Sequence, residues 1–454
     1  MFFIDNFLNI QTLPNEARRI LYIIIFINCL ASLMIGLTST FQILYVIDNI
    51  GISQAGLLMG VYGIILALFD YPTGGLGDWI GHRWVLFSGS ITFAIGMLLL
   101  PYSKDFNSIF VVYIIFAFSQ AQMSGAGLAW LDNNYRRAVK DADPKRKIYG
   151  YAMSRIGIFP SILSVIAFSL GGFVATVSSR EILFSITGVS LFFLSFLVLI
   201  LMKDYNKEET GTKERKFSEY FSVLAKGIRF SISSKKIFFF LMGNTMITVM
   251  WGIWGSLVLF PLYFGYTGSD ALAGSLRSII FALGIFLTIY TSKASQKLAN
   301  SILWKFLLLH AFIFFGGFAI IITFLPLEND INILGMVITI LVVTFVNNIL
   351  IGISSILLNR ITIDIIPNDI RNSIYSLTPT IAALFGVFLI PIVGYLIELE
   401  GFPLGLVFIG FIEILAVICF LIFFKYYKDL PLSEEEDIKL ILIEDSSIED
   451  TYSS

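Results

Sequence analysis

The chain has 454 residues, of which 57% are hydrophobic and 14% are charged, and its formal net charge is -2. Soluble domains carry about 25% charged residues, so this composition excludes an ordinary soluble protein and predicts a chain that is mostly embedded in a membrane. The small net charge indicates no class of charged partner, whereas the distribution of the charges along the chain is informative.

Apolar runs of about 20 residues, each long enough to cross a bilayer as a helix, recur along the whole sequence. They predict an all-α membrane protein with about twelve spans, near residues 18–46, 54–76, 84–101, 108–131, 149–176, 182–202, 236–263, 272–292, 302–326, 332–358, 373–397 and 402–425. The first run is too long for a secretory signal, so we expect it to be retained as a helix.

Basic residues fall on one side of these spans. If the N-terminus is cytoplasmic, that side receives nearly all of them: Arg18, Arg19, Arg83, residues 136–147, the segment 203–235, Lys293, Lys297, Lys305, Arg360, Arg371 and Lys425. The opposite loops hold little beyond Lys104 and Arg180. The positive-inside rule therefore predicts a multi-pass protein of the plasma membrane with both termini in the cytoplasm.

Residues 74–83 (GGLGDWIGHR) form a short, glycine-rich, charged break between two apolar runs, which we predict to be a tight loop between two membrane helices. The segment resembles the loop between the second and third helices of major facilitator superfamily transporters. The positions that match that loop are Gly74, Leu76, Asp78, Gly81 and Arg83, while Trp79 and His82 replace residues that are usually basic.

The resemblance implies two bundles of six helices, at residues 1–202 and 236–428, with a cytoplasmic linker at 203–235 and an acidic cytoplasmic tail at 429–454. Short echoes between the halves support a duplication. Ala55 and Gly56 open the second span as Ala273 and Gly274 open the eighth. A duplicated architecture places the solute site between the halves, near the middle of the membrane.

The same resemblance implies a conformational switch at the motif. Its members would be Gly74, Asp78, Gly81 and Arg83, with Asp132 at the end of the fourth span pairing with Arg83 to latch the outward-open state.

Ionisable side chains inside membrane spans are costly and need a partner or a role. Asp70 and Glu413 are our candidates for proton coupling. The alternative for Asp70 is a structural pair with Arg83 or Arg155. The alternatives for Glu413 are a hydrogen bond with His310 or a neutral structural acid on a helix that usually lies outside the cavity.

Other polar and aromatic residues lie on spans that line the cavity in the resembling fold. The predicted substrate contacts are Asn28, Gln120, Gln122, Asn244, Thr248, Trp251, Arg277 and Asn347. For Arg277 the functional interpretation is contact with an anionic group, and the alternative is a side chain that reaches the outer interface. For the amides the alternative is hydrogen bonding between helices.

The sequence offers no pattern for catalysis or for a cofactor. Only two cysteines, Cys29 and Cys419, and two histidines, His82 and His310, are present, with no metal-binding cluster and no phosphate-binding loop. We therefore expect neither an enzyme nor an ATPase, and no metal and no cofactor. The expected partners are a small-molecule substrate, protons and the lipid bilayer, with no nucleic acid, and the chain is expected to act as a monomer.

These observations predict transport of a small organic solute by alternating access. The narrower prediction is proton-coupled export of an amphipathic compound, as in multidrug-efflux antiporters. Uptake or facilitated diffusion of a polar metabolite is the alternative, favoured by the amide-rich lining and the scarcity of buried acids. Residues 118–127 also lack the span-four arginine that is typical of drug antiporters of this superfamily, which argues against proton-driven drug efflux. An alternative of another class is a membrane sensor that transports nothing.

Overall fold

The computed structural model describes residues 2–139, 142–144, 146–203, 228–327, 331–366 and 371–427, without the side chains of residues 2, 71–75, 78, 79, 371–373, 375 and 376. The central part of the linker and the acidic tail lie outside the described residues. Twelve segments of the described chain are helices long and apolar enough to cross a membrane, which confirms the predicted spans and fold class.

Six of these crossings form the first half of the protein. Before them, the short helix α1 (Phe2–Leu8) precedes the first crossing. The six crossings are α2 (Asn15–Thr38) with α3 (Phe41–Ile50), α4 (Ile52–Ile80), α5 (His82–Leu99) extended by η1 (Leu100–Tyr102), α6 (Phe106–Met123) with α7 (Ala126–Val139), α8 (Lys147–Ile156) with α9 (Ile158–Val177), and α10 (Arg180–Leu201).

The other six crossings form the second half. They are α12 (Lys235–Ile253) with η3 (Trp254–Val258) and α13 (Leu259–Thr267), α14 (Asp270–Ser295), η4 (Asn300–Ile302) with α15 (Leu303–His310), η5 (Ala311–Gly316) and α16 (Gly317–Phe324), α17 (Ile333–Leu341) with η6 (Val342–Asn347) and α18 (Asn348–Ile365), α19 (Arg371–Glu400), and α20 (Phe402–Tyr426).

Polar caps start several crossings where the apolar runs begin. The hydroxyl of Ser179 accepts a hydrogen bond from the backbone N–H of Ile182, which satisfies a free donor at the start of α10. Asp105 forms a reciprocal capping box with Ser108 at the start of α6. The helix boundaries therefore follow local chemistry as well as hydropathy.

The structure corrects the prediction for residues 74–83. The backbone does not form a loop there, because α4 continues through the glycines to Ile80 and α5 begins at His82. Gly81 alone separates the two helices, with a φ of 99° that residues with a side chain rarely adopt. The glycines before it have helical backbone, so the turn needs only one residue.

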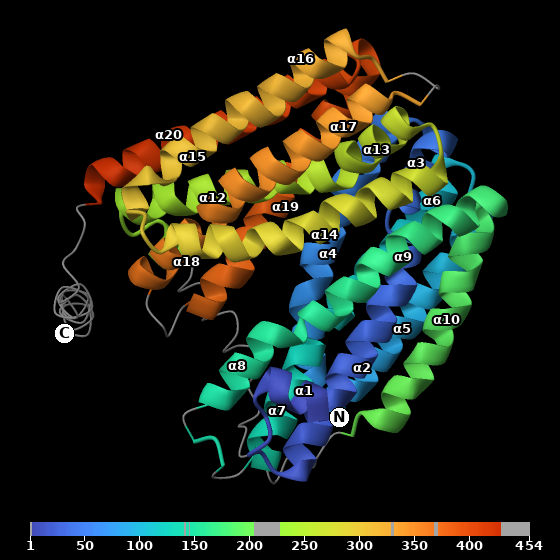
Figure 1. Cartoon of the computed structure of the whole chain (residues 1–454), viewed down its shortest axis with the longest axis vertical. Coiled ribbons are helices and arrows are strands. Elements are labelled where there is room, and N and C mark those ends of the chain that lie inside the picture. Colours follow the sequence, from blue (N-terminus) through green and yellow to red (C-terminus); the bar gives the residue numbers. More distant parts are fainter. Residues whose placement is uncertain are drawn as a thin grey trace, which may run out of the picture.

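Twelve crossings return the chain to the side where it started, so the described chain begins and ends at the same end of the bundles, here called the terminal end. The opposite end is called the far end. The two halves meet near the far end and diverge toward the terminal end (Figure 1). Helix α4 packs against α19, and α9 packs against α14. This conformation is closed at the far end.

Glycines allow the two halves to approach closely. A side chain at Gly56 would come within 3.1 Å of the backbone oxygen of Ile390 and 3.3 Å of the Cα atom of Gly394. A side chain at Gly274 would collide with the backbone oxygen of Phe168. Gly56 and Gly274 belong to the echoing pairs of the two halves, so equivalent positions make equivalent contacts.

Candidate functional site

A cavity of about 760 Å³ lies between the two halves. Four helices provide its walls, which are α4 and α6 with the following Ser124 on the first half and α12 and α19 on the second. The volume is in the range of sites that bind compounds of drug or metabolite size.

The cavity walls are mostly small and apolar. Gly60, Gly63, Ala382, Ala383 and Gly386 contribute almost no side chain, which leaves room for a solute. These residues were not predicted as site residues. The signal that would have found them is the spacing of small residues along the second and eleventh spans.

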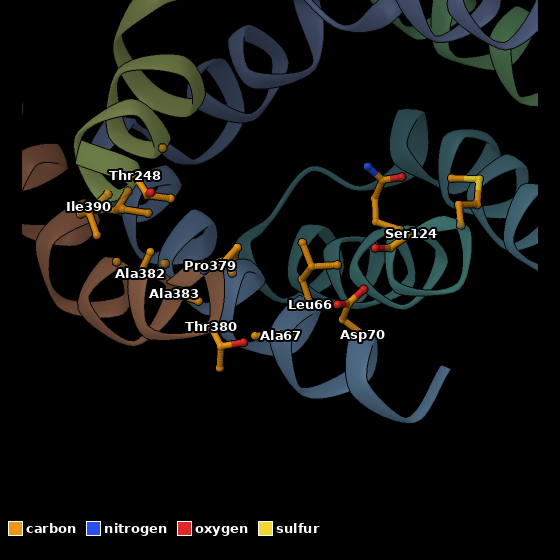
Figure 2. A pocket seen from close by; sticks show the side chains of 17 residues that line it. Leu66, Ala67, Asp70, Ser124, Thr248, Pro379, Thr380, Ala382, Ala383 and Ile390 are labelled. Carbon is orange, nitrogen blue, oxygen red and sulfur yellow. The ribbon is translucent and has the colours of Figure 1, made fainter. Parts of the chain in front are cut away.

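A few polar groups interrupt these walls. The cavity is lined by Asp70, Gln120, Ser124, Thr248 and Thr380, and Asp70 is the ionisable member of the described lining. Figure 2 shows Asp70 and Ser124 on one side of the cavity and Thr248 on the opposite side, beside Ile390. An apolar space with a few polar groups suits an amphipathic molecule.

Of the eight predicted substrate contacts, Gln120 and Thr248 lie in this lining. Asn28 is exposed and Asn244 is half-buried, and neither belongs to the described lining. Gln122 points instead to the neighbouring helix α5, where its side-chain oxygen accepts a hydrogen bond from the hydroxyl of Ser88. Its contact is the bond between helices that was the alternative interpretation.

Arg277 lies at the interface of the halves and outside the described cavity lining. Its Nη1 atom donates to the hydroxyls of Ser39 and Thr40, each at 2.7 Å. The guanidinium carbon lies 3.7 Å from the ring centre of Phe168 and 4.4 Å from that of Phe260. Arg277 therefore joins the second half to the first in this conformation.

A second arginine makes the reciprocal connection. Arg180, on the first half, donates to the carboxylate of Asp270 on the second half from Nε at 2.9 Å and from Nη2 at 2.7 Å. Its Nη1 atom also bonds Asp48. Since Asp270 begins α14 of the second half, its pair with Arg180 holds the far end closed, while Asp48, on α3 of the first half, holds the guanidinium in place.

Trp251, Asn347 and Glu413 belong to one group with His310 inside the second half. The Nδ1 atom of His310 lies 2.9 Å and 2.8 Å from the two carboxylate oxygens of Glu413. Its Nε2 atom lies 3.2 Å from the side-chain oxygen of Asn347. The hydrogen bond that was one alternative for Glu413 is thus confirmed, and Asn347 contacts His310 instead of belonging to the described lining.

The residues of the predicted switch lie at the terminal end of the first half. Gly74 and Asp78 belong to α4, and the side chain of Asp78 is not among those that the structure describes. The guanidinium of Arg83 lies 5.3 Å from the ring centre of Trp84. Asp132 pairs with Arg136, at 2.9 Å, and with Arg146. The described partners of Asp132 thus differ from the predicted Arg83, because Arg136 lies one helical turn away and Arg146 also reaches the carboxylate.

The loop at the terminal end of α7 is tied by a buried carboxylate. Asp143 accepts hydrogen bonds from the backbone N–H of Tyr149 at 2.9 Å and of Ile148 at 3.3 Å, and from the hydroxyl of Tyr135 at 3.0 Å. Burial raises the pKa of Asp143, but the hydrogen bonds from Tyr149, Tyr135 and Ile148 outweigh it and hold the pKa below its usual value.

Comparison with known proteins agrees with this geometry. A family model described as Major Facilitator Superfamily matches residues 21–378. The fold is similar to a crystal structure of the nucleoside transporter NupG, with a TM-score of 0.71, 14% identity, and coverage of 90% of this chain and 100% of that one.

It is also similar to an auto-inhibited POT family peptide transporter, with a TM-score of 0.66, 10% identity, and coverage of 92% of this chain and 98% of that one. At these identities the structural likeness concerns the fold alone. No curated protein matches the sequence.

Proposed function

Because the chain belongs to the major facilitator superfamily, we propose that it moves a small amphipathic solute through the cavity between its halves by alternating access. The observation that carries the proposal is the cavity of about 760 Å³ with small apolar walls and few polar groups. In the described conformation the far end is closed by Arg180 and Arg277. Transport then needs a second state in which these contacts are broken.

The direction we propose is export coupled to protons. Asp70 supports this proposal, because a carboxylate in the cavity lining can be reached by a proton or by the polar end of a solute from the open side. Orientation with the termini in the cytoplasm would make the described conformation the one that loads solute from the cytoplasm.

A second candidate is uptake or facilitated diffusion of a polar metabolite. Gln120, Ser124, Thr248 and Thr380 offer hydrogen bonds that such a solute needs. The similar structures are those of a nucleoside transporter and a peptide transporter, which favours the same class of solute.

Reconstitution into liposomes with an imposed pH gradient tests both candidates. The probes are ethidium as an amphipathic cation, uridine as a nucleoside and a neutral dipeptide. We expect the pH gradient to drive ethidium flux and Asp70→Asn to reduce it, with Glu398→Gln as a control at an exposed acid of α19. Flux of uridine or dipeptide without ethidium flux would favour the second candidate. Binding without flux of any probe would favour a sensor.

A further inference from the structure

A buried polar cluster, formed by His310, Glu413 and Asn347, lies inside the second half, apart from the described cavity lining. His310 and Glu413 are both 0% exposed, and Asn347 is 9% exposed. Its members come from α15, α20 and η6, so three crossings of the bundle meet there. Polar groups buried this deeply in a membrane bundle need both a partner and a reason to be retained.

The contacts of His310 define one arrangement of protons for this cluster. With the amide oxygen of Asn347 as the acceptor, Nε2 of His310 carries a hydrogen and donates it. Nδ1 faces both oxygens of Glu413, so one further proton must lie between the imidazole and the carboxyl group, on either side of the contact. In both forms the pair is neutral overall. Loss of this proton would leave a buried carboxylate facing a nitrogen lone pair, which is unfavourable.

Aromatic rings enclose the pair in this conformation. The ring of Phe314 stacks on His310 with centres 4.8 Å apart, and the ring of Phe315 meets it edge-on at 5.5 Å. Trp254 packs on Phe314 at 4.9 Å. These rings themselves offer no hydrogen bond that could stabilise a separated charge.

Other charges are distant along the helices that pack here. On α12, α15, α18, α19 and α20 the other described charged side chains lie toward the helix ends, and they are Lys235, Lys236, Lys305, Arg360, Asp364, Glu398, Glu400 and Lys425. The described groups with which the proton interacts most directly are therefore His310 and Glu413 themselves.

One side chain connects the pair to the cavity wall. Trp251 lies on α12 between Thr248 and Gly252, which both line the cavity. Its ring centre is 6.5 Å from that of His310. This half-buried ring therefore lies beside the imidazole, on a helix whose neighbouring residues line the cavity.

The helices change geometry at the same level. Three π-helical segments occur in the described second half: η3 begins three residues after Trp251, η5 begins directly after His310, and η6 ends at Asn347. π-helical turns have less favourable backbone hydrogen bonds than α-helical turns, and they occur frequently at functional sites. These three segments are therefore positions at which the backbone of the crossings can change its hydrogen bonding.

We propose that His310 and Glu413 together bind one transported proton, which is enclosed in the described conformation and exchanges with cavity water when Trp251 moves. On release, the proton leaves the contact between Nδ1 and the carboxyl group for water, and a carboxylate and a neutral imidazole remain. The proposal deepens the proposed function and rests on its proton coupling. The alternative is a fixed structural hydrogen bond that never exchanges its proton.

Nitrogen NMR tests the binding step without any solute. The chain has two histidines, so ¹⁵N-histidine labelling in lipid nanodiscs gives two imidazoles, and His310→Gln identifies the signals of His310. We expect the His310 nitrogen signals to change in a pH series from about 5 to 9, because the shared proton exchanges with water, and to respond differently in Glu413→Gln, which cannot share that proton. Signals of His310 that stay constant throughout this series in the unmodified protein would overturn the proposal.

Flux separates this proposal from the function on which it rests. In liposomes, Glu413→Gln should lose the component of ethidium flux that depends on the pH gradient but keep ethidium exchange at equal pH, because only the proton step is removed. Glu398→Gln should behave as the unmodified protein. Normal pH-driven flux in Glu413→Gln refutes the proton site and leaves the proposed function intact, whereas absence of pH-driven flux in the unmodified protein refutes the coupling itself.

Loss of exchange as well as pH-driven flux in Glu413→Gln would indicate a structural role, provided that the variant is folded by size-exclusion chromatography. His310→Gln gives an independent measurement, since a glutamine can keep a hydrogen bond to Glu413 but cannot share a proton with it at neutral pH. Retained pH-driven flux in that variant would also contradict the proposal.

Discussion

Single side chains join the two halves, and Arg277 is the one with the most specific environment. Its guanidinium is bonded to two hydroxyls and stacked between two phenylalanine rings. A planar group suits this place, whereas an ammonium group of the same charge does not. The residue therefore acts in the closure of the far end in this conformation.

We expect Arg277→Lys to weaken this closure by about 1 to 2 kcal/mol, because the cation remains but the stack on the rings is lost. Spin labels at Tyr102 and Phe324, which are 83% and 80% exposed near the far end of the two halves, can measure it in a background without native cysteines. Their distance distribution should shift to longer values. Lys293→Arg on the same helix is the control, and an unchanged distribution in Arg277→Lys would contradict the assignment.

The loop after α7 should be sensitive to acid through Asp143. The lowered pKa means that the carboxylate stabilises the folded loop above the pKa of the unfolded state, and that this contribution is lost as the pH falls through the folded pKa. Asp143→Asn should therefore lower the stability at neutral pH by about 1 to 3 kcal/mol. Thermal unfolding in detergent should show the two proteins converging at acid pH, and a constant difference at every pH would reject this explanation.

At the scale of elements, the junction of α4 and α5 depends on Gly81. Its φ of 99° strains any residue with a side chain, at a cost of about 1 to 3 kcal/mol. We proposed from the motif that this junction supports the change between states. In the structure Gly81 is the single residue between the two helices, so a change at this position acts on both of them.

Gly81→Ala should reduce the rate of solute flux while the protein still inserts and purifies as a folded species. Gly150→Ala on α8 is a matched control, because it adds the same methyl group where no atom lies within 4 Å. Liposome flux, normalised to the amount of reconstituted protein, gives the comparison. Equal rates for both variants would show that the junction takes no part in the switch.

At the scale of the molecule, the two halves are separate bundles whose closest backbone approach at the far end occurs at glycines. Gly172 and Gly274 face each other there, and an added Cβ atom at either would collide with backbone of the other half. Backbone cannot yield as a flexible side chain can, so an added methyl group must push the halves apart.

Gly274→Ala should therefore favour the conformation that is open at the far end. The spin labels at Tyr102 and Phe324 should report a longer mean distance, and labels at Arg136 and Lys297 near the terminal end should report a shorter one. The opposite directions of the two changes distinguish alternating access from local unfolding. Lengthening at both ends would argue against a rocking motion of the halves.

The orientation in the membrane is a separate prediction for the whole molecule. A reporter fused after Lys140 should be cytoplasmic and one inserted near Asn49 should be external, because the basic loops share one side. Reporters with the opposite locations would reverse the proposed direction of loading without changing the fold.

The number and limits of the crossings could be predicted from the sequence, because the cost of placing polar groups in lipid is set by each segment alone. Gln120 and Thr248, predicted as substrate contacts, and Asp70, predicted as a candidate for proton coupling, line the cavity; their helices follow from the family resemblance, whereas their roles stay predictions. A break between two helices was predicted for residues 74–83, but the structure confines it to Gly81, because the glycines before it adopt helical backbone.

The partners of the buried charges were decided by the tertiary structure. Arg277 and Thr40 are separated by 237 positions, and His310 and Glu413 by 103, so no local pattern specifies their contacts. The same holds for the close approach of Gly274 to Phe168. Hydropathy determines that each helix enters the membrane. It has almost no influence on which helices pack together, because lipid tails and apolar side chains are alike in polarity. Shape complementarity and hydrogen bonds therefore select the neighbouring helices.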